Sequence, residues 1–174
     1  EWLAVHGCGG VGLSAIMIAS AMGAQVVAID VTEEKLAFAR GFGASIAINA
    51  TKVADVAEAV RDATGGGAHV SIDALGSAKT SYNSVMSLRR RGRHVQVGLM
   101  LHDDADALVP MSRVLAHELE IRGSHGMQAH RYPEMMRMIA NGRLAPERLI
   151  GWQLSLTQAP AALAAMVNFP GQGI

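Results

Sequence analysis

The sequence predicts an α/β fold with a doubly wound, parallel, six-stranded sheet covered by helices on both faces. Short apolar runs alternate along the chain with helical patterns of about ten to fifteen residues, which is the order of repeated βαβ units. The runs are almost continuously apolar, as expected of strands buried on both faces. A glycine-rich turn joins the first run to the first helical pattern, as this fold class requires.

The first three strands and the helices between them are delimited by clear end signals. Strands are expected at residues 2–6, 25–30 and 44–48. A helix over residues 11–22 ends at Gly23, a good C-terminal cap. A second helix begins after Thr32, a plausible N-cap, with Glu33 and Glu34 in the first turn, where the helix dipole favours negative charge.

A third helix is expected after Thr51, which can cap it. An apolar stripe at i, i+3, i+4 and i+7 supports this helix: Val53, Val56, Ala57 and Val60. Three consecutive glycines at residues 65–67 end it, and a fourth strand follows at residues 69–73.

The alternation continues for two more strands. We expect a helix over residues 78–88, a fifth strand over residues 93–98, a short helix over residues 111–117 and a sixth strand over residues 119–123. The arginines at residues 89–91 then fall at the C-terminal end of a helix, where cations complement the dipole. We therefore do not interpret them as a nucleic-acid-binding patch.

The alternation breaks down after residue 126. The expected elements are a methionine-rich helix over residues 132–141, a strand over residues 149–154, and a helix over residues 158–169 with Thr157 at its N-cap. We assign residues 1–126 to the sheet domain and residues 127–174 to an incomplete part of a second domain, whose apolar face should be exposed. The chain starts without methionine, inside the pattern of a buried strand, which indicates a piece of a longer protein.

Composition excludes several classes of protein. Fifteen basic and fifteen acidic side chains cancel, which argues against binding to nucleic acid or to an anionic membrane. No apolar run reaches the roughly 18 residues of a membrane span. The one cysteine, Cys8, allows no intrachain disulfide and is expected to be a small packing residue. The seven histidines lack the spacing of a zinc site, so we predict no metal ligand among them. As a separate expectation, we place the protein in the cytoplasm.

The strongest candidate site is the turn Gly7-Cys8-Gly9-Gly10-Val11-Gly12, which has the spacing G-x-G-x-x-G. Gly7 allows the tight turn, Gly9 lets a pyrophosphate approach the backbone, and Gly12 lets the helix pack closely on the strands. The free N–H groups of Gly10 and Val11, at the positive end of the helix dipole, would bind the phosphates. Between a strand and a helix, this turn predicts a Rossmann dinucleotide-binding site.

Asp30 ends the second strand, 18 residues after Gly12. A carboxylate there can accept hydrogen bonds from both hydroxyls of an adenosine ribose. Its charge would repel the 2′-phosphate of NADP, and Glu33 and Glu34 would add to that repulsion. No arginine at positions 31–34 compensates, so we predict NAD as the cofactor.

These segments resemble the medium-chain dehydrogenase/reductase family, in particular its zinc-type alcohol dehydrogenases. The resemblance is carried by residues 4–12 and 23–30, by Lys35, by Asp73-Ala74-Leu75-Gly76, by residues 92–98, and by Ile121-Arg122-Gly123-Ser124. Their order and spacing cover nearly all of residues 1–126. The resemblance implies an oxidoreductase that transfers a hydride between NAD(H) and an alcohol, aldehyde or ketone.

The resemblance also implies further contacts. The cofactor would meet Lys35 at the adenosine ribose, Ala74 and Leu75 at the end of the fourth strand, Val97, Gly98 and Leu99 along the nicotinamide, and Ser124 near the carboxamide. The family pairs its subunits along the edge of the sixth strand, which implies a homo-oligomer. The implied partner of the parent protein is a small-molecule alcohol or aldehyde.

Zinc is implied for the parent protein only. The family's catalytic ligands are a cysteine, a Gly-His-Glu segment and another cysteine or acid, all upstream of the glycine-rich turn and absent from this sequence. The structural zinc lobe of many members is also upstream. We therefore expect the chain alone to be inactive. The family's zinc-free quinone reductases are an alternative, although they usually use NADP, against which Asp30 argues.

Two functions of other classes stay open. A methyltransferase binds S-adenosylmethionine over a similar turn, but usually has an acid just before the first glycine, where Val5 and His6 stand here. A non-enzymatic Rossmann nucleotide sensor would share the same turn. A short-chain dehydrogenase is excluded, because neither Tyr82 nor Tyr132 is followed four residues later by lysine.

Overall fold

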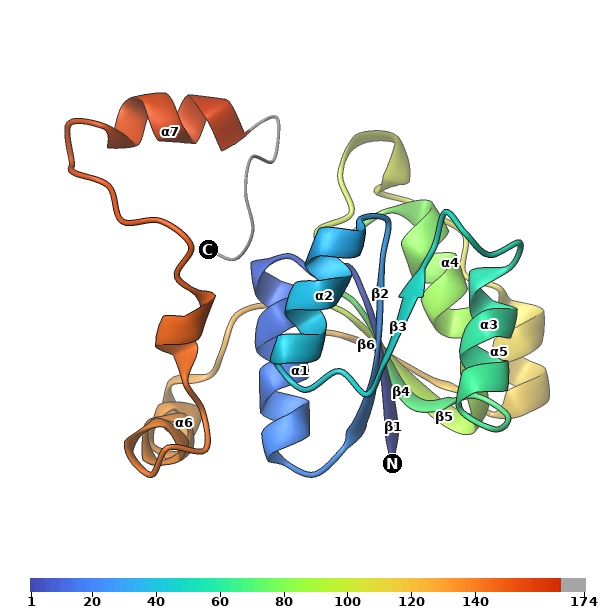
Figure 1. The fold of residues 1–174 in the computed structure, drawn as a ribbon. Helices are drawn as coiled ribbons and strands as arrows, with labels where there is room; N and C mark the ends of the chain where they lie inside the picture. Colours follow the sequence, from blue (N-terminus) through green and yellow to red (C-terminus); the bar gives the residue numbers. More distant parts are fainter. Residues whose placement is uncertain (167–174) are drawn as a thin grey trace.

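The computed structural model describes residues 1–166 and contains a six-stranded sheet. Its strands are β1 (Trp2–His6), β2 (Gln25–Asp30), β3 (Ile46–Asn49), β4 (Ala68–Asp73), β5 (Leu88–Gln96) and β6 (Glu120–Gly123). Every neighbouring pair is parallel, and the strand order is β3-β2-β1-β4-β5-β6 (Figure 1). This is the order of the doubly wound dinucleotide-binding fold, and it confirms the predicted fold class.

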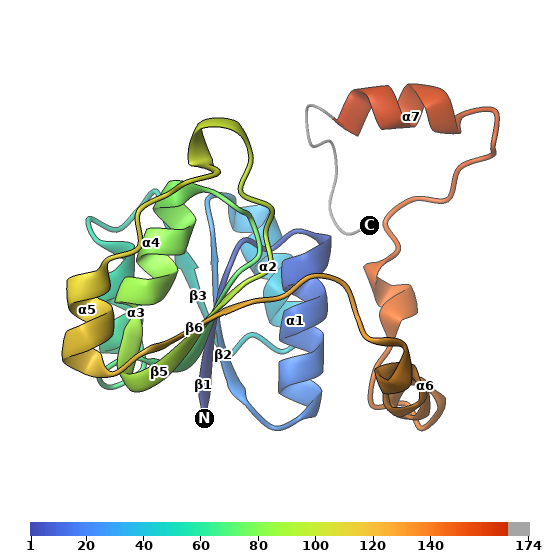
Figure 2. The ribbon, with the colours of Figure 1, turned by 180° about the vertical axis from the view of Figure 1, so that it is seen from behind.

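Helices cover both faces of the sheet. They are α1 (Gly10–Ala21), α2 (Glu33–Gly41), α3 (Val56–Ala63), α4 (Ala78–Met86), α5 (Met111–His117), α6 (Tyr132–Ala140) and α7 (Ala159–Ala165), with short 3-10 turns at His102–Asp104, Ala129–Arg131 and Pro146–Leu149. Figure 1 and the reverse view in Figure 2 show α1 and α2 on one face and α3, α4 and α5 on the other.

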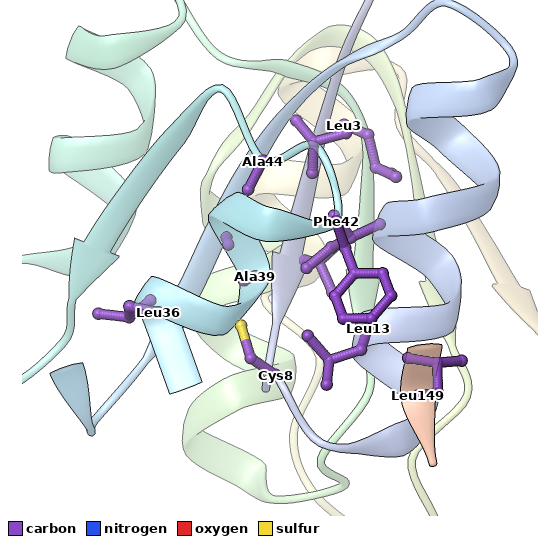
Figure 3. Close-up of a cluster of buried hydrophobic side chains, with 12 residues drawn as sticks. Leu3, Cys8, Leu13, Leu36, Ala39, Phe42, Ala44 and Leu149 are labelled. Carbon is purple, nitrogen blue, oxygen red and sulfur yellow. The ribbon is translucent and has the colours of Figure 1, made fainter. Parts of the chain in front are cut away.

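Two of the apolar clusters that hold these layers on the sheet lie on opposite sides of β1. On the face covered by α1 and α2, Leu3 and Val5 of β1 pack with Leu13 and other buried side chains (Figure 3). On the opposite face, Ala4 packs with Val60 of α3 and its neighbours. Consecutive residues of β1 thus enter opposite clusters, which is the period of two that a strand buried on both faces requires.

The start of α3 differs from the prediction. Asp55 is the N-cap, and its side chain accepts a hydrogen bond from the N–H of Glu58 at 2.8 Å. The predicted cap Thr51 is wrong, because the side-chain oxygen of Asn49 accepts hydrogen bonds from both its N–H and its hydroxyl. Those bonds keep Thr51 in a turn between β3 and the helix.

The arginines at residues 89–91 lie in β5, so their predicted place at a helix end is wrong. The helix α4 ends at Met86, and Leu88 is fully buried opposite Ala68 of β4. The strand therefore begins at Leu88, and its regular pairing with β4 resumes at Arg93. The pairing shifts register between Ala68 and Val70, and Arg91 has a positive φ of 59°, so β5 begins with an irregularity.

The segment after residue 126 is anchored on the outer side of α1 and α2. Leu149 is buried in the same cluster as Leu13 and Phe42 (Figure 3). The guanidinium of Arg143 donates to the carbonyl of Ala21 at 2.6 Å, and that of Arg148 donates to the carbonyl of Gly41 at 2.8 Å.

Two predictions for this segment need correction. The predicted strand over residues 149–154 is wrong: residues 146–149 form a 3-10 turn, and residues 150–155 have no regular structure. The last helix begins at Ala159 with Gln158, not Thr157, at its N-cap, and its predicted end at Phe169 lies outside the described residues.

Much of the segment is exposed, as predicted. The helix α6 buries none of its residues, and Met136 is 55% exposed. Trp152 and Leu154 in the irregular stretch are also exposed. Figures 1 and 2 show α6 and α7 beyond the α1 layer. Across residues 1–166, no helix is both long and apolar enough to span a membrane.

Candidate cofactor-binding site

The residues predicted to bind a cofactor gather along the carboxyl edge of the sheet, near the top in Figure 1. His6 of β1 pairs with Ile29 on one side and with Asp73 of β4 on the other. The glycine-rich turn, Asp30 and the loop after Asp73 therefore follow strand residues that lie side by side, at the same height along the strands. The strand order reverses between β1 and β4, and ligands of open α/β sheets bind at such a point.

The glycine-rich turn has a geometry that depends on its glycines. Gly7 has a φ of +97° and donates its N–H to the carbonyl of Ile29 at 2.8 Å. A Cβ on Gly12 would overlap the carbonyl oxygen of Gly7, so only glycine allows α1 to approach β1 so closely. A Cβ on Gly9 would meet nothing within 4 Å, which leaves open space beside the turn.

The helix α1 begins with free hydrogen-bond donors. Its N-cap is Gly9, which has no side chain to cap it, and no acidic residue lies in its first turn. The N–H of Leu13 makes the first helical bond, to Gly9 at 2.8 Å. The N–H groups of Gly10 and Val11 therefore have no partner within the helix. Such donors at the positive end of a helix dipole favour an anion.

Asp30 connects the end of β2 to the glycine-rich turn. Its Oδ2 accepts a hydrogen bond from the N–H of Cys8 at 2.8 Å. Its Oδ1 accepts bonds from the N–H of Val31 at 2.8 Å and from the N–H and hydroxyl of Thr32, each at 3.1 Å. Thr32 is the N-cap of α2 as predicted, but its hydroxyl bonds to Asp30 and does not cap the helix.

Cys8 is buried, as predicted, and chemically inert. Burial, reinforced by the nearby carboxylate of Asp30, raises the pKa of its thiol to about 12, so it is not a thiolate near neutral pH. The charge of Lys35 acts in the opposite direction on this pKa. Glu33, in contrast, forms an ion pair with Lys52 at 2.7 Å.

The loops at residues 74–76 and 97–99 lie against each other. A Cβ on Gly76 would overlap the carbonyl oxygen of Leu99, and a Cβ on Gly98 would overlap the backbone nitrogen of Gly76. A Cβ on Gly7 would lie 3.3 Å from the Cβ of Leu75. The turn and the two loops therefore form one continuous row, with Ala74, Val97 and Gly98 within it.

Ser124 follows β6 at the far end of this row. Its N–H donates to the carbonyl of Gln96 at 2.9 Å, which extends the β5–β6 pairing by one residue. The N–H of Ser124 is therefore engaged in the sheet.

Sequence reasoning missed three residues of this edge. The first is Val31, which directly follows Asp30 and is 59% exposed, as is the predicted residue Leu75. The signal for Val31 was an apolar residue just after the carboxylate that ends a strand. Asp73 and Gln96 end β4 and β5, and the Asp73 carboxylate accepts bonds from the N–H groups of Leu75 and Gly76 at 2.9 and 3.0 Å. Their signal was a polar residue at the end of each apolar run.

His6 lies below the turn and is almost completely buried. Burial lowers the pKa of its imidazole to about 4, although Asp73 acts to raise it. Its Nε2 has no hydrogen-bond partner in the described structure. The side chain is therefore a neutral buried group at physiological pH.

Within residues 1–166, no three His, Cys, Asp or Glu side chains come together in a way that could hold a metal ion. The side chains present here therefore do not fit a catalytic zinc ion, and we assign no step to a metal in this part of the chain.

Comparison with known proteins identifies the family. Residues 10–141 match the model of the family described as zinc-binding dehydrogenase. An alcohol dehydrogenase of Geobacillus stearothermophilus is 34% identical over 146 residues, which are 84% of this chain and 42% of that protein. An alcohol dehydrogenase of Moraxella sp. is 37% identical over 124 residues, or 71% of this chain and 35% of that protein.

Solved structures agree with these sequence matches. The alcohol dehydrogenase TADH from Thermus sp. ATN1 superposes with a TM-score of 0.89 and 31% identity, over 97% of this chain and 48% of that one. An alcohol dehydrogenase zinc-binding domain protein from Burkholderia ambifaria superposes with a TM-score of 0.89 and 28% identity, over 98% of this chain and 46% of that one.

The chain thus spans less than half the length of the relatives named above. They are alcohol dehydrogenases, and they do not support a methyltransferase or a nucleotide sensor. The match covers the glycine-rich turn from Gly10 onward, the loops at residues 74–76 and 97–99, and β6. The chain belongs to the zinc-binding dehydrogenase family.

Proposed function

We propose that this chain binds NAD(H) for an enzyme that transfers a hydride between the cofactor and a small alcohol, aldehyde or ketone. The observation that carries the proposal is the bond between Asp30 and the glycine-rich turn at the point where strand order reverses. It holds a carboxylate beside an uncapped helix N-terminus and beside the open space at Gly9. Those features fit the ribose and the pyrophosphate of a dinucleotide.

Each part of the row then has one task. The N–H groups of Gly10 and Val11 bind the pyrophosphate, while Asp30 and Lys35 bind the adenosine ribose. The remaining proposed contacts, on the side of the nicotinamide, are Ala74, Leu75, Val97, Gly98, Leu99 and the carbonyl of Ser124. The cofactor supplies the hydride chemistry; the chain supplies binding and orientation.

The proposed cofactor is NAD and not NADP. The carboxylate of Asp30 stands where a 2′-phosphate would lie, and Oδ1 and Oδ2 are held in place by four hydrogen bonds. Swinging the carboxylate away would break those bonds. Two negative groups at close range repel strongly when partly removed from water.

For the parent protein, we propose a zinc-dependent alcohol dehydrogenase whose metal ligands come from outside the described residues. We also propose that residues 1–126 form the cofactor domain and that residues 127–174 belong to a catalytic domain. The exposed apolar side chains of Met136 and Trp152 support that division. The parent would form a homo-oligomer along β6, whose four residues are all exposed.

A fluorescence titration of the chain with NADH and NADPH tests the proposed function. We expect NADH to bind at least about tenfold more tightly, equal to about 1.4 kcal/mol of charge repulsion. Equal affinities would contradict the choice of NAD. Absence of binding by either dinucleotide would contradict the proposed cofactor site.

A further inference from the structure

A row of buried polar side chains crosses the sheet beneath α4, where an apolar core would be expected. Ser71, Asp73 and Ser84 are fully buried, and His94 is 2% exposed. Ser71 pairs with His94, and Asp73 pairs with Gln96, so these four strand side chains project to one face. Buried polar groups in folded proteins are nearly always hydrogen-bonded.

Chemistry fixes the orientation of the Gln96 amide. Its nitrogen lies 2.8 Å from Oδ2 of Asp73 and 2.8 Å from the carbonyl oxygen of Gly98. Both atoms are acceptors, so the NH₂ group must face them, and it donates one bond to each. The oxygen of the Gln96 amide must then face the other way.

That oxygen determines the protonation of His94. Oε1 of Gln96 lies 3.2 Å from Nε2 of His94 and can only accept, so Nε2 carries the proton. Burial lowers the pKa of His94, so the ring is neutral and its Nδ1 is an acceptor. The hydroxyl of Ser84, 2.8 Å away, must donate to Nδ1. Ser71, 2.7 Å from Ser84, then donates to Ser84.

The chain of bonds therefore runs in one direction, from Ser71 to the carboxylate of Asp73. At its end, Asp73 holds the N–H groups of Leu75 and Gly76, while Gln96 holds the carbonyl of Gly98. One buried carboxylate thus connects the loops at residues 74–76 and 97–99. The contacts of Asp30 and the glycine-rich turn are not part of this network.

We propose that Gln96 and Asp73 are positioning residues for the nicotinamide half of the cofactor site, held in register by a one-directional hydrogen-bond chain that fixes His94 as its Nε2–H tautomer. The ligand part of this inference rests on the proposed NAD(H) function. The tautomer part rests on the described contacts alone.

The tautomer is tested by NMR of the chain labelled with ¹⁵N-histidine. Wild-type His94 should show a protonated Nε2 and an unprotonated Nδ1 acceptor at neutral pH. In Gln96→Leu, the bond that selects this tautomer is lost, and the His94 signals should shift toward a mixture of tautomers. A protonated Nδ1 in the wild type would overturn the chain of bonds.

The positioning role is tested by calorimetric titration with NAD⁺ and with ADP-ribose, which lacks the nicotinamide. Gln96→Leu should weaken NAD⁺ binding about fivefold to tenfold, the size expected for the net loss of one hydrogen bond, and should leave ADP-ribose binding unchanged. The matched control is Gln25→Leu. Gln25 is exposed at the start of β2, at the end of the sheet opposite the candidate site, so this variant should change neither affinity. Equal losses for both ligands, or no loss for NAD⁺, would overturn the positioning role.

A second variant, Gln96→Glu, tests the same role without changing the shape of the buried side chain. Gln96→Glu keeps the shape but places a carboxylate against Asp73, and the pair should share one proton as pH falls. The affinity of this variant for NAD⁺ should therefore recover at mildly acidic pH, relative to the wild type. A pH-independent ratio between the two proteins would contradict the role of the Gln96 NH₂ group.

The outcomes separate this inference from the proposed function. If the wild type binds neither NAD⁺ nor ADP-ribose, the proposed function fails and the ligand part of the inference fails with it. If it binds both and Gln96→Leu loses neither, the proposed function stands and the positioning role fails.

Discussion

The carboxylate of Asp30 accepts a hydrogen bond from the backbone N–H of Cys8 at 2.8 Å. This bond joins the end of β2 to the turn between β1 and α1, although the two residues are 22 positions apart. It fixes the distance between the carboxylate and the free N–H groups of α1. The spacing between a ribose site and a phosphate site is therefore set by the folded backbone.

Replacing the charge at this position should weaken the discrimination between cofactors. Asp30→Asn keeps an oxygen that can accept the Cys8 bond but removes the repulsion of a 2′-phosphate. We expect the ratio of NADPH to NADH dissociation constants to fall about tenfold, measured by fluorescence titration. Asp62→Asn, at an exposed position of α3, is the control. An unchanged ratio in Asp30→Asn would show that Asp30 does not select the cofactor.

Gly12 should tolerate no side chain. Gly12→Ala would place a methyl group on the carbonyl oxygen of Gly7, so α1 must move away from β1. We expect a loss of more than about 3 kcal/mol in the free energy of unfolding, measured with urea. Gly41→Ala is the matched control, because a Cβ there meets nothing within 4 Å. Similar stability of the two variants would disprove the close-packing role.

Acid should destabilise the protein through His6. Its pKa is about 4 in the folded chain, below the ordinary value of 6.5, so between these values the unfolded state binds the proton more strongly. The contribution of His6 to the free energy of unfolding is complete above about pH 6.5 and is lost as pH falls toward 4. The largest possible loss is about 3 kcal/mol. The neighbouring charges are Asp73, which opposes the shift, and His94, which adds to it.

The variant His6→Leu isolates this contribution. Leucine fills the buried position without a titrating group, so urea unfolding between about pH 7 and pH 4.5 should show a shallower loss of stability than in the wild type. His130→Leu, at an exposed position, should keep the wild-type pH dependence. Equal slopes for wild type and His6→Leu would contradict the assignment of acid sensitivity to His6.

The chain alone should bind cofactor without turning over substrate. No metal-binding group was found among residues 1–166, and the proposed catalytic zinc lies with residues from elsewhere in the parent. We expect no formation of NADH above background from primary or secondary alcohols with NAD⁺ and added zinc. Measurable turnover by the purified 174-residue chain would refute this division of labour.

Much of the fold could be predicted because its signals are local. The run Gln25–Asp30 is bounded by a glycine and an acid, and its limits match the strand in the structure. Local signals fail where another side chain competes. The amide of Asn49 holds Thr51 away from the helix, and the burial of Leu88 draws the following arginines into β5.

The candidate site could be predicted only in part, for the same reason. The glycine-rich turn and Asp30 have fixed spacing in the sequence and a direct physical purpose. The bond between Gln96 and Asp73 joins residues 23 positions apart and depends on strand pairing that the sequence does not display. The apolar run at residues 149–154 looks like a strand, but only Leu149 finds a place in the core.

The most direct test of the central claim is to map where NAD⁺ binds, by following backbone ¹H–¹⁵N shifts of the chain during a titration. We expect saturable shifts at Gly10, Val11 and Gly98 along the carboxyl edge, with Val70 and Arg89 at the opposite end unaffected. Saturable shifts confined to that opposite end, or none at the glycine-rich turn, would contradict it.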